Sequence, residues 1–374
     1  MAQSPQIESP TLETMLMRTV VSEGAETSMK MHVQVDIPAL GPDEEPVKPG
    51  CVIQVGELGR EWADILKLGS CKRVDSLSAA IHGIIDQHKL GASAAALVIS
   101  PESEVKDTSS LIAAIELLNR IDMPMYVISC ASAIDHRLLS QFATLSGGEF
   151  ALLDNPHAID ASIGTILHRA KTGVRRVGFL TIEVPTMMNI ESFCTVAPQF
   201  GLIQMSTASR PKNSISFPLL SVGQGASSRQ FFLSVNIPPL ASGQYQLAHL
   251  KCIETLADQN TCLSECRTSF SILGGSTEPG RIEPMAARIS EKLQLTMLVE
   301  LIAQAYLRED GGTISRTLTQ IESALLRLEQ GELALRVGQL RVDFLHRGSF
   351  ALPELNETWL LADRASRSLI ECAE

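Results

Sequence analysis

Positive charge is scarce in this sequence of 374 residues. Lys and Arg total 31 against 42 Asp and Glu, so the formal charge at pH 7 is −11. The sequence also has no run of three or more consecutive basic residues. Binding of nucleic acid or of an anionic membrane surface depends mainly on Lys and Arg. The composition therefore excludes a general nucleic-acid-binding protein, and the 45% of apolar residues excludes a disordered chain.

Long apolar runs are missing as well. The most apolar stretch, Ala92–Ile99, is far shorter than the roughly 20 residues that a membrane-spanning helix needs. The first ten residues have neither the basic nor the apolar region of a secretory signal. The eight cysteines are spread along the chain and do not form a disulfide framework. We therefore expect a cytoplasmic protein with reduced thiols and no membrane insertion.

Motifs for catalysis and cofactor binding are also missing. The sequence contains no Gly-x-Ser-x-Gly, P-loop, dinucleotide fingerprint or His-Glu-x-x-His. The run Gly147-Gly-Glu-Phe150 matches the signature of diguanylate cyclases, but it follows a predicted helix, where glycine serves as a left-handed cap. Cys252, Cys262 and Cys266 lack the paired spacing of a four-ligand zinc site. We expect no enzyme, no catalytic residue and no cofactor.

The part of the chain from residue 51 to 175 alternates strand and helix patterns. Continuous apolar runs are typical of strands buried on both faces of a parallel sheet, and apolar residues at steps of three and four indicate helices. The predicted strands are Cys51–Val55, Ala94–Ile99, Met125–Cys130 and Phe150–Leu153. The predicted helices are Asp75–His88, Ser109–Ile121, Arg137–Leu145 and Ala158–Ala170. This alternation predicts an α/β domain with helices on both faces of the sheet.

Residues 176–275 read differently, with 6 basic and 5 acidic side chains and several short strands between turns. This regular spacing predicts a β-sandwich. An earlier strand within residues 31–40 alternates in the same way and ends in Ile37-Pro38, just as a later strand ends in Ile237-Pro238. We expect it to join the sandwich, with the α/β domain inserted between. Residues 1–30 are expected to be a partly flexible tail.

Residues 281–372 are rich in charge and show leucine periodicity. One apolar face includes Ile289, Leu293 and Met297, and a second runs from Ile314 to Leu328 at steps of four and three. Gly311-Gly-Thr313 between them predicts a helix end followed by a new helix capped by Thr313. We expect a C-terminal helical bundle. The expected fold class is thus α/β plus all-β plus α.

The order of these parts resembles that of von Willebrand factor A domain proteins of bacterial type. The run Met123–Phe150 is similar to the closing half of that domain, with a strand, a loop containing Asp135, a helix with a Leu pair, and Gly-Gly before an aromatic residue. The segments Ser216–Gly223, Phe232–Pro239 and Gly243–Ala248 resemble the β-sandwich that follows it in many bacterial members. The resemblance implies a Rossmann-like parallel sheet and an adaptor or scaffold protein.

The same resemblance implies a Mg²⁺ site, but this sequence departs from its motif at three places. The expected Asp-x-Ser-x-Ser after the first strand reads Gly56-Glu-Leu-Gly59. Val74 stands where a Thr oxygen is expected, and the usual Thr-Asp-Gly turn reads Ile99-Ser-Pro101. A Val side chain has no oxygen to offer Mg²⁺. We therefore expect the metal-ion-dependent adhesion site to be lost. The opening strand–helix–strand of the domain is either missing or diverged.

Oxygen atoms of Asp75, Ser76 and Ser78 are the weak candidates for an improvised metal site, although a helix N-cap by Asp75 is the favoured interpretation. Our main hypothesis is a non-catalytic protein-interaction or assembly protein without a metal. Its partner would be another protein, with an AAA-type ATPase or a second copy as candidates by resemblance. The alternatives are a metal-dependent adhesion module and a coat-like structural subunit. Interaction loops at the carboxyl edge of the sheet are expected to carry Glu57, Arg60, Arg73, Glu102, Asp135 and His136, the last as a solvated histidine.

Overall fold

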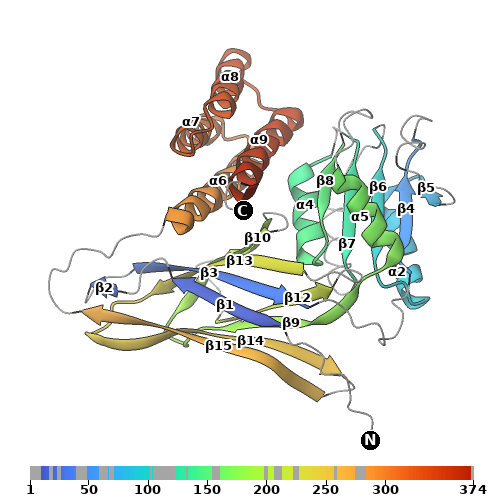
Figure 1. The fold of residues 1–374 in the computed structure, drawn as a ribbon. Coiled ribbons are helices and arrows are strands. Elements are labelled where there is room, and N and C mark those ends of the chain that lie inside the picture. The colour runs from blue at the N-terminus through green and yellow to red at the C-terminus, as the bar shows by residue number, and fades with distance from the viewer. Residues whose placement is uncertain are drawn as a thin grey trace, which may run out of the picture.

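The protein's structure is a computed structural model in which three domains pack against one another (Figure 1). It describes residues 10–16, 20–22, 27–38, 49–58, 66, 71–101, 103, 123–131, 134–153, 161–197, 201–205, 213–221, 227–256, 259–273 and 284–371. The expected helix at Ser109–Ile121 and the loop residues Arg60 and Glu102 lie outside the described residues.

The first domain is a sandwich of two five-stranded sheets. Its strands are β1 (Thr11–Leu16), β2 (Val20–Ser22), β3 (Thr27–Ile37), β9 (Arg175–Glu183), β10 (Asn189–Ala197), β11 (Gly201–Met205), β12 (Ser214–Ser221), β13 (Ser227–Ile237), β14 (Gly243–Leu256) and β15 (Gln259–Leu273). One sheet has the order β1-β3-β13-β10-β11 and the other β12-β9-β14-β15-β2. Alternate residues of facing strands, such as Val33, Leu180 and Phe231, are fully buried between them.

The tail before residue 31 was expected to be partly flexible, and its described part contains the strands β1 and β2 and the first residues of β3. Strand β1 pairs antiparallel with β3, from Thr11 opposite Asp36 to Leu16 opposite Met31. Leu12 and Leu16 pack against the core of the sandwich. A strand of six residues with only two core contacts is too weak a pattern to be predicted from the sequence alone. Strand β1 is the edge strand of its sheet, and its pairing with β3 stabilises it.

The second domain is inserted between β3 and β9 and contains a parallel sheet. Its elements are β4 (Cys51–Val55), β5 (Lys72–Val74), α2 (Leu77–Lys89), β6 (Ala95–Ile99), β7 (Met125–Ser129), α4 (His136–Leu145), β8 (Phe150–Leu152) and α5 (Ala161–Thr172). The sheet order is β5-β4-β6-β7-β8, and all its neighbouring strands are parallel. One buried cluster joins it to α2 and α4 and another joins it to α5, so helices cover both faces, as the sequence predicts.

The third domain is a bundle of helices. They are α6 (Pro284–Leu307), α7 (Gly311–Arg327), α8 (Gly331–Arg347) and α9 (Leu352–Glu371). Leu318, Ile321 and Leu325 form the buried centre of the bundle with apolar residues of the other helices. The N-cap of α7 is Asp310 and not Thr313, because the Asp310 carboxylate accepts the Thr313 amide N–H at 3.0 Å. Among the described helices, none is long and apolar enough to cross a membrane.

The sandwich holds the α/β domain at the amino ends of its parallel strands. The turn between α4 and β8 packs on the sandwich, because Gly147 lies against Leu220 and its carbonyl accepts a hydrogen bond from the buried Arg229 of β13 at 3.0 Å. Gly147 has φ +81, which confirms the left-handed glycine expected after this helix. The carboxyl ends of β4 to β7 therefore point away from the sandwich, and the helical bundle stands beside α4 (Figure 1).

Candidate functional site

The carboxyl edge of the parallel sheet is the candidate site, because ligands of open α/β sheets bind there. Strand order reverses at β4. The next strand along the chain, β5, pairs with β4 on one side, and the strand after that, β6, pairs with it on the other side. Glu57 follows β4, and Arg73 lies within the edge strand β5, where the sequence analysis expected a loop. Their exposed side chains form an ion pair of 3.2 Å between Arg73 Nη1 and Glu57 Oε1. This edge is therefore polar and open to solvent.

The point of reversal itself is closed by two serines. Ser100 follows β6, and its Oγ lies 2.8 Å from Ser103 Oγ, whose hydroxyl also donates to the Val55 carbonyl at 3.2 Å. The backbone N–H of Ser100 donates to the same carbonyl at 3.0 Å. Gly56 (φ +75) fits here because a Cβ at this position would lie 2.3 Å from Ser100 Oγ. The Ser103 hydroxyl therefore satisfies a backbone carbonyl, and the two hydroxyl groups are bonded to each other.

The weak metal candidates lie at the start of α2. Ser76 is the N-cap, accepting the Ala79 amide N–H at 3.2 Å, so the expected cap at Asp75 is wrong by one residue. Asp75, Ser76 and Ser78 are all exposed. Within the described part of the chain, no three His, Cys, Asp or Glu side chains lie together in a way that could hold a metal ion. One carboxylate beside a capping serine is a weak ligand set for a hard cation.

Asp135 and His136 follow β7, at the start of α4. Asp135 is the N-cap, and its Oδ1 accepts the amide N–H groups of Arg137 and Leu138 at 3.0 and 3.3 Å. The expectation of a solvated His136 is wrong, because its side chain is buried and only 4% of the residue surface is exposed. The reason is tertiary: helix α9, 220 residues further along the chain, covers this loop.

Asn356 and Trp359 of α9 make that cover. The Asn356 side chain accepts the His136 amide N–H at 3.1 Å and donates to the Ile134 carbonyl at 2.8 Å. The Trp359 ring lies edge-on to Phe150, with ring centroids 5.4 Å apart. One amide thus satisfies two backbone groups of the loop between β7 and α4. The helical bundle therefore occupies one end of the carboxyl edge, whereas Glu57 after β4 and Arg73 in β5 are exposed.

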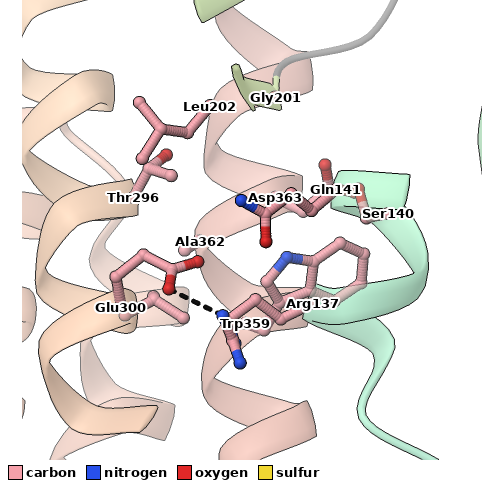
Figure 2. A pocket seen from close by; sticks show the side chains of 11 residues that line it. Arg137, Ser140, Gln141, Gly201, Leu202, Thr296, Glu300, Trp359, Ala362 and Asp363 are labelled. Atoms are coloured by element: carbon pink, nitrogen blue, oxygen red, sulfur yellow. Dashed lines mark hydrogen bonds and ion pairs between the residues drawn. The ribbon is translucent and has the colours of Figure 1, made fainter. Parts of the chain in front are cut away.

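A small cavity of about 40 Å³ lies behind this contact, where α4, α6, α9 and β11 meet (Figure 2). Arg137 bridges two acids there, with 2.7 Å to Glu300 Oε2 and 3.1 Å to Asp135 Oδ2. Burial raises the pKa of the Glu300 carboxyl above its usual range, although Arg137 acts against the shift. Asp363 of α9 lines the same cavity. The space fits one or two water molecules and no larger ligand.

Asn356, Trp359, Arg137 and Glu300 were not predicted from the sequence as members of this region. Each is an ordinary helix residue in its own segment. Their partners lie 163 to 222 residues away, so no local pattern brings them together. The isolated Asn in a helix rich in good helix formers was the only available signal.

Comparison with known proteins gives structural likenesses alone. No family model matches the sequence, and no curated protein matches it. Among solved structures, a von Willebrand factor type A protein from Catenulispora acidiphila superposes with a TM-score of 0.63 at 12% identity, covering 89% of this chain and 90% of that one. The ArnB paralog VWA2 from Sulfolobus acidocaldarius superposes with a TM-score of 0.54 at 10% identity, covering 96% and 99%. The chain therefore has the fold of von Willebrand factor A domain proteins over most of its length.

Proposed function

We propose that the chain is a non-catalytic protein-interaction module that binds a protein partner at the carboxyl edge of its parallel sheet, without a metal ion. The observation that carries this proposal is the closed reversal point, where Ser100 and Ser103 bond to each other and to the Val55 backbone. In this fold, the edge is where a ligand is expected to bind. An edge whose hydroxyl groups are already used by the protein recognises a partner by shape and hydrogen bonds.

The open part of the edge suits a protein surface of mixed charge. Arg73 and Glu57 form an exposed pair, and Asp75 lies exposed at the start of α2. Exposed pairs of this kind contribute little to stability, so they are free to exchange their bonds with a partner. An AAA-type ATPase, suggested by resemblance, and a second copy of the chain are the two candidate partners. Neither requires an ion at the edge.

The experiment is capture of a partner from native lysate by the full chain, followed by cross-linking mass spectrometry. The charge of the edge is reversed in one variant, Arg73→Asp, which places an acid beside Glu57. The matched control is Arg267→Asp on β15, another exposed arginine, which pairs with Glu265 at 4.0 Å on the sandwich. Light scattering over a concentration series reports on self-assembly in the same preparations.

We expect the same partner to be captured by wild type and by Arg267→Asp, in EDTA as well as in Mg²⁺, and to be lost in Arg73→Asp. Cross-links should join the partner to residues near Glu57 and Lys72. Capture that needs Mg²⁺ would favour a metal-dependent adhesion module instead. Equal capture by the edge variant and wild type would show that the partner binds elsewhere.

A further inference from the structure

His136 is held in one neutral form by its surroundings. Its Nε2 lies 2.6 Å from the Ala131 carbonyl oxygen. A carbonyl oxygen can only accept a hydrogen bond, so Nε2 carries the proton and Nδ1 of the neutral ring is bare. Nδ1 is buried and has no hydrogen-bond partner among the residues that the structure describes. The ring is therefore satisfied at one nitrogen only.

The ring also lies where two domains meet. Its centroid is 6.1 Å from that of Phe150 in β8 and 6.2 Å from that of Trp359 in α9. The His136 amide N–H is the donor to Asn356 Oδ1. We call the two hydrogen bonds of Asn356, together with the contact of Trp359 on His136, the latch. Any change at the His136 ring acts directly on the latch.

A second proton on His136 would enter an unfavourable place. It would have to bind Nδ1, which is buried, and the residue lies at the positive N-terminal end of α4. Asp135 is the acid beside it, but that carboxylate already accepts two amide N–H groups and the Arg137 guanidinium. Glu300 of α6 pairs with Arg137, and Asp363 of α9 lines the cavity behind. Burial lowers the pKa of His136, outweighing the opposite effects of the Ala131 carbonyl and Asp135.

We propose that the latch between the loop after β7 and helix α9 is released by acid, through protonation of His136. With the latch open, the imidazole reaches water and both nitrogens can be protonated. The docked state excludes the second proton, so the docking equilibrium shifts toward the open state as pH falls below about 6.5, the ordinary value for histidine. Between pH 7.5 and 5.5 the docking constant should fall by up to about tenfold, the limit reached when the docked ring takes up no second proton.

Glu300 acts in the opposite direction, which gives the proposal a second signature. Because burial raises the pKa of Glu300, the docked state takes up a proton at that carboxyl more readily than the open state. Protonation of Glu300 therefore favours docking as pH falls. Glu300→Gln removes this opposing effect, and the response of the latch to acid should become steeper.

Hydrogen–deuterium exchange of the full chain tests the proposal, because the His136 amide is itself protected by Asn356. Exchange rates are divided by the intrinsic rate at each pH, so that only opening of the structure is compared. We expect protection at His136 and around Asn356 to fall from pH 7.5 to 5.5, by up to about tenfold. Protection of the buried strands β6 and β7 should stay constant, since the sheet does not unfold.

Two variants separate His136 from other titrating groups. His136→Gln keeps a donor for the Ala131 carbonyl and cannot titrate, so its protection should not change with pH in this range. His168→Gln removes an exposed histidine on α5 and should respond like wild type. If His136→Gln fails to fold, the proposal is still tested in wild type, by comparing the pH dependence of protection at the latch with that in β6 and β7. Constant protection at His136 in wild type, or equal loss at the latch and in the sheet, would overturn the proposal, as would a pH response that persists in His136→Gln.

Discussion

Removal of the Asn356 side chain should separate the helical bundle from the α/β domain. Asn356 is 6% exposed, and its amide satisfies the His136 N–H at 3.1 Å and the Ile134 carbonyl at 2.8 Å. Asn356→Ala leaves both backbone groups buried without these partners. Each such group costs about 1–3 kcal/mol, so we expect the variant to lose about 2–6 kcal/mol of stability. For a chain of this length, the corresponding fall in melting temperature is about 3–8 °C.

The assay is thermal and urea unfolding followed by circular dichroism, with two controls. Gln339→Ala removes an exposed amide on α8 that bonds Asp343 at 2.8 Å, and it should change stability by less than about 0.5 kcal/mol. Asn356→Asp keeps the acceptor for His136 but places an oxygen against the Ile134 carbonyl, so it should also destabilise. Equal stability of Asn356→Ala and Gln339→Ala would refute the reasoning that this amide holds the two domains together.

Two further predictions concern glycine and a buried lysine. In Gly148→Ala the new Cβ would lie 1.9 Å from the Met125 carbonyl oxygen, so we expect the free energy of unfolding to fall by at least about 1–3 kcal/mol. In Gly164→Ala on α5 the new Cβ meets nothing within 4 Å, and the free energy of unfolding should rise by about 0.5–1 kcal/mol. Thermal unfolding compares the two variants. Burial lowers the pKa of Lys292, which is 2% exposed, to about 8. Above that value the unfolded chain binds a proton here that the folded chain lacks, so stability rises with pH between about 8 and 10.5. Lys292→Met should remove about 2–3 kcal/mol of this rise between pH 7.5 and 10, as measured by urea midpoints; an unchanged slope would contradict the prediction.

The elements that sequence patterns predicted best are those whose burial is clear, a helix buried along one face or a strand buried on both. Helix α2 and strand β6 follow from the spacing of Ile81 and Ile84 and from the run Ala94–Ile99, because burial alone dictates these residues. Strands β10 and β15 were missed, since Ser, Thr, Cys and Glu occupy most of their outward positions. The three residues of β5 form a strand only because β4 offers them an edge to pair with.

The candidate site was predictable in place but not in detail. Parallel strands bring their carboxyl ends to one edge whatever the loops contain, so Glu57, Asp75 and Asp135, which each follow a strand, lie at that edge. Whether a loop residue faces water depends on distant segments. His136 is buried because α9 lies on it, and this contact is encoded by Asn356 and Trp359 in another domain. Local periodicity carries no information about such pairs.

The central claim, that partner binding at the carboxyl edge needs no metal ion, is tested most directly by isothermal titration of Mg²⁺ into the full chain after treatment with chelator. The same titration of Asp75→Ala serves as the reference, since Asp75 is the exposed acid nearest to the serines at the start of α2. We expect no saturable heat up to millimolar Mg²⁺ and identical traces for both proteins. Stoichiometric binding at micromolar Mg²⁺ that Asp75→Ala abolishes would contradict the claim.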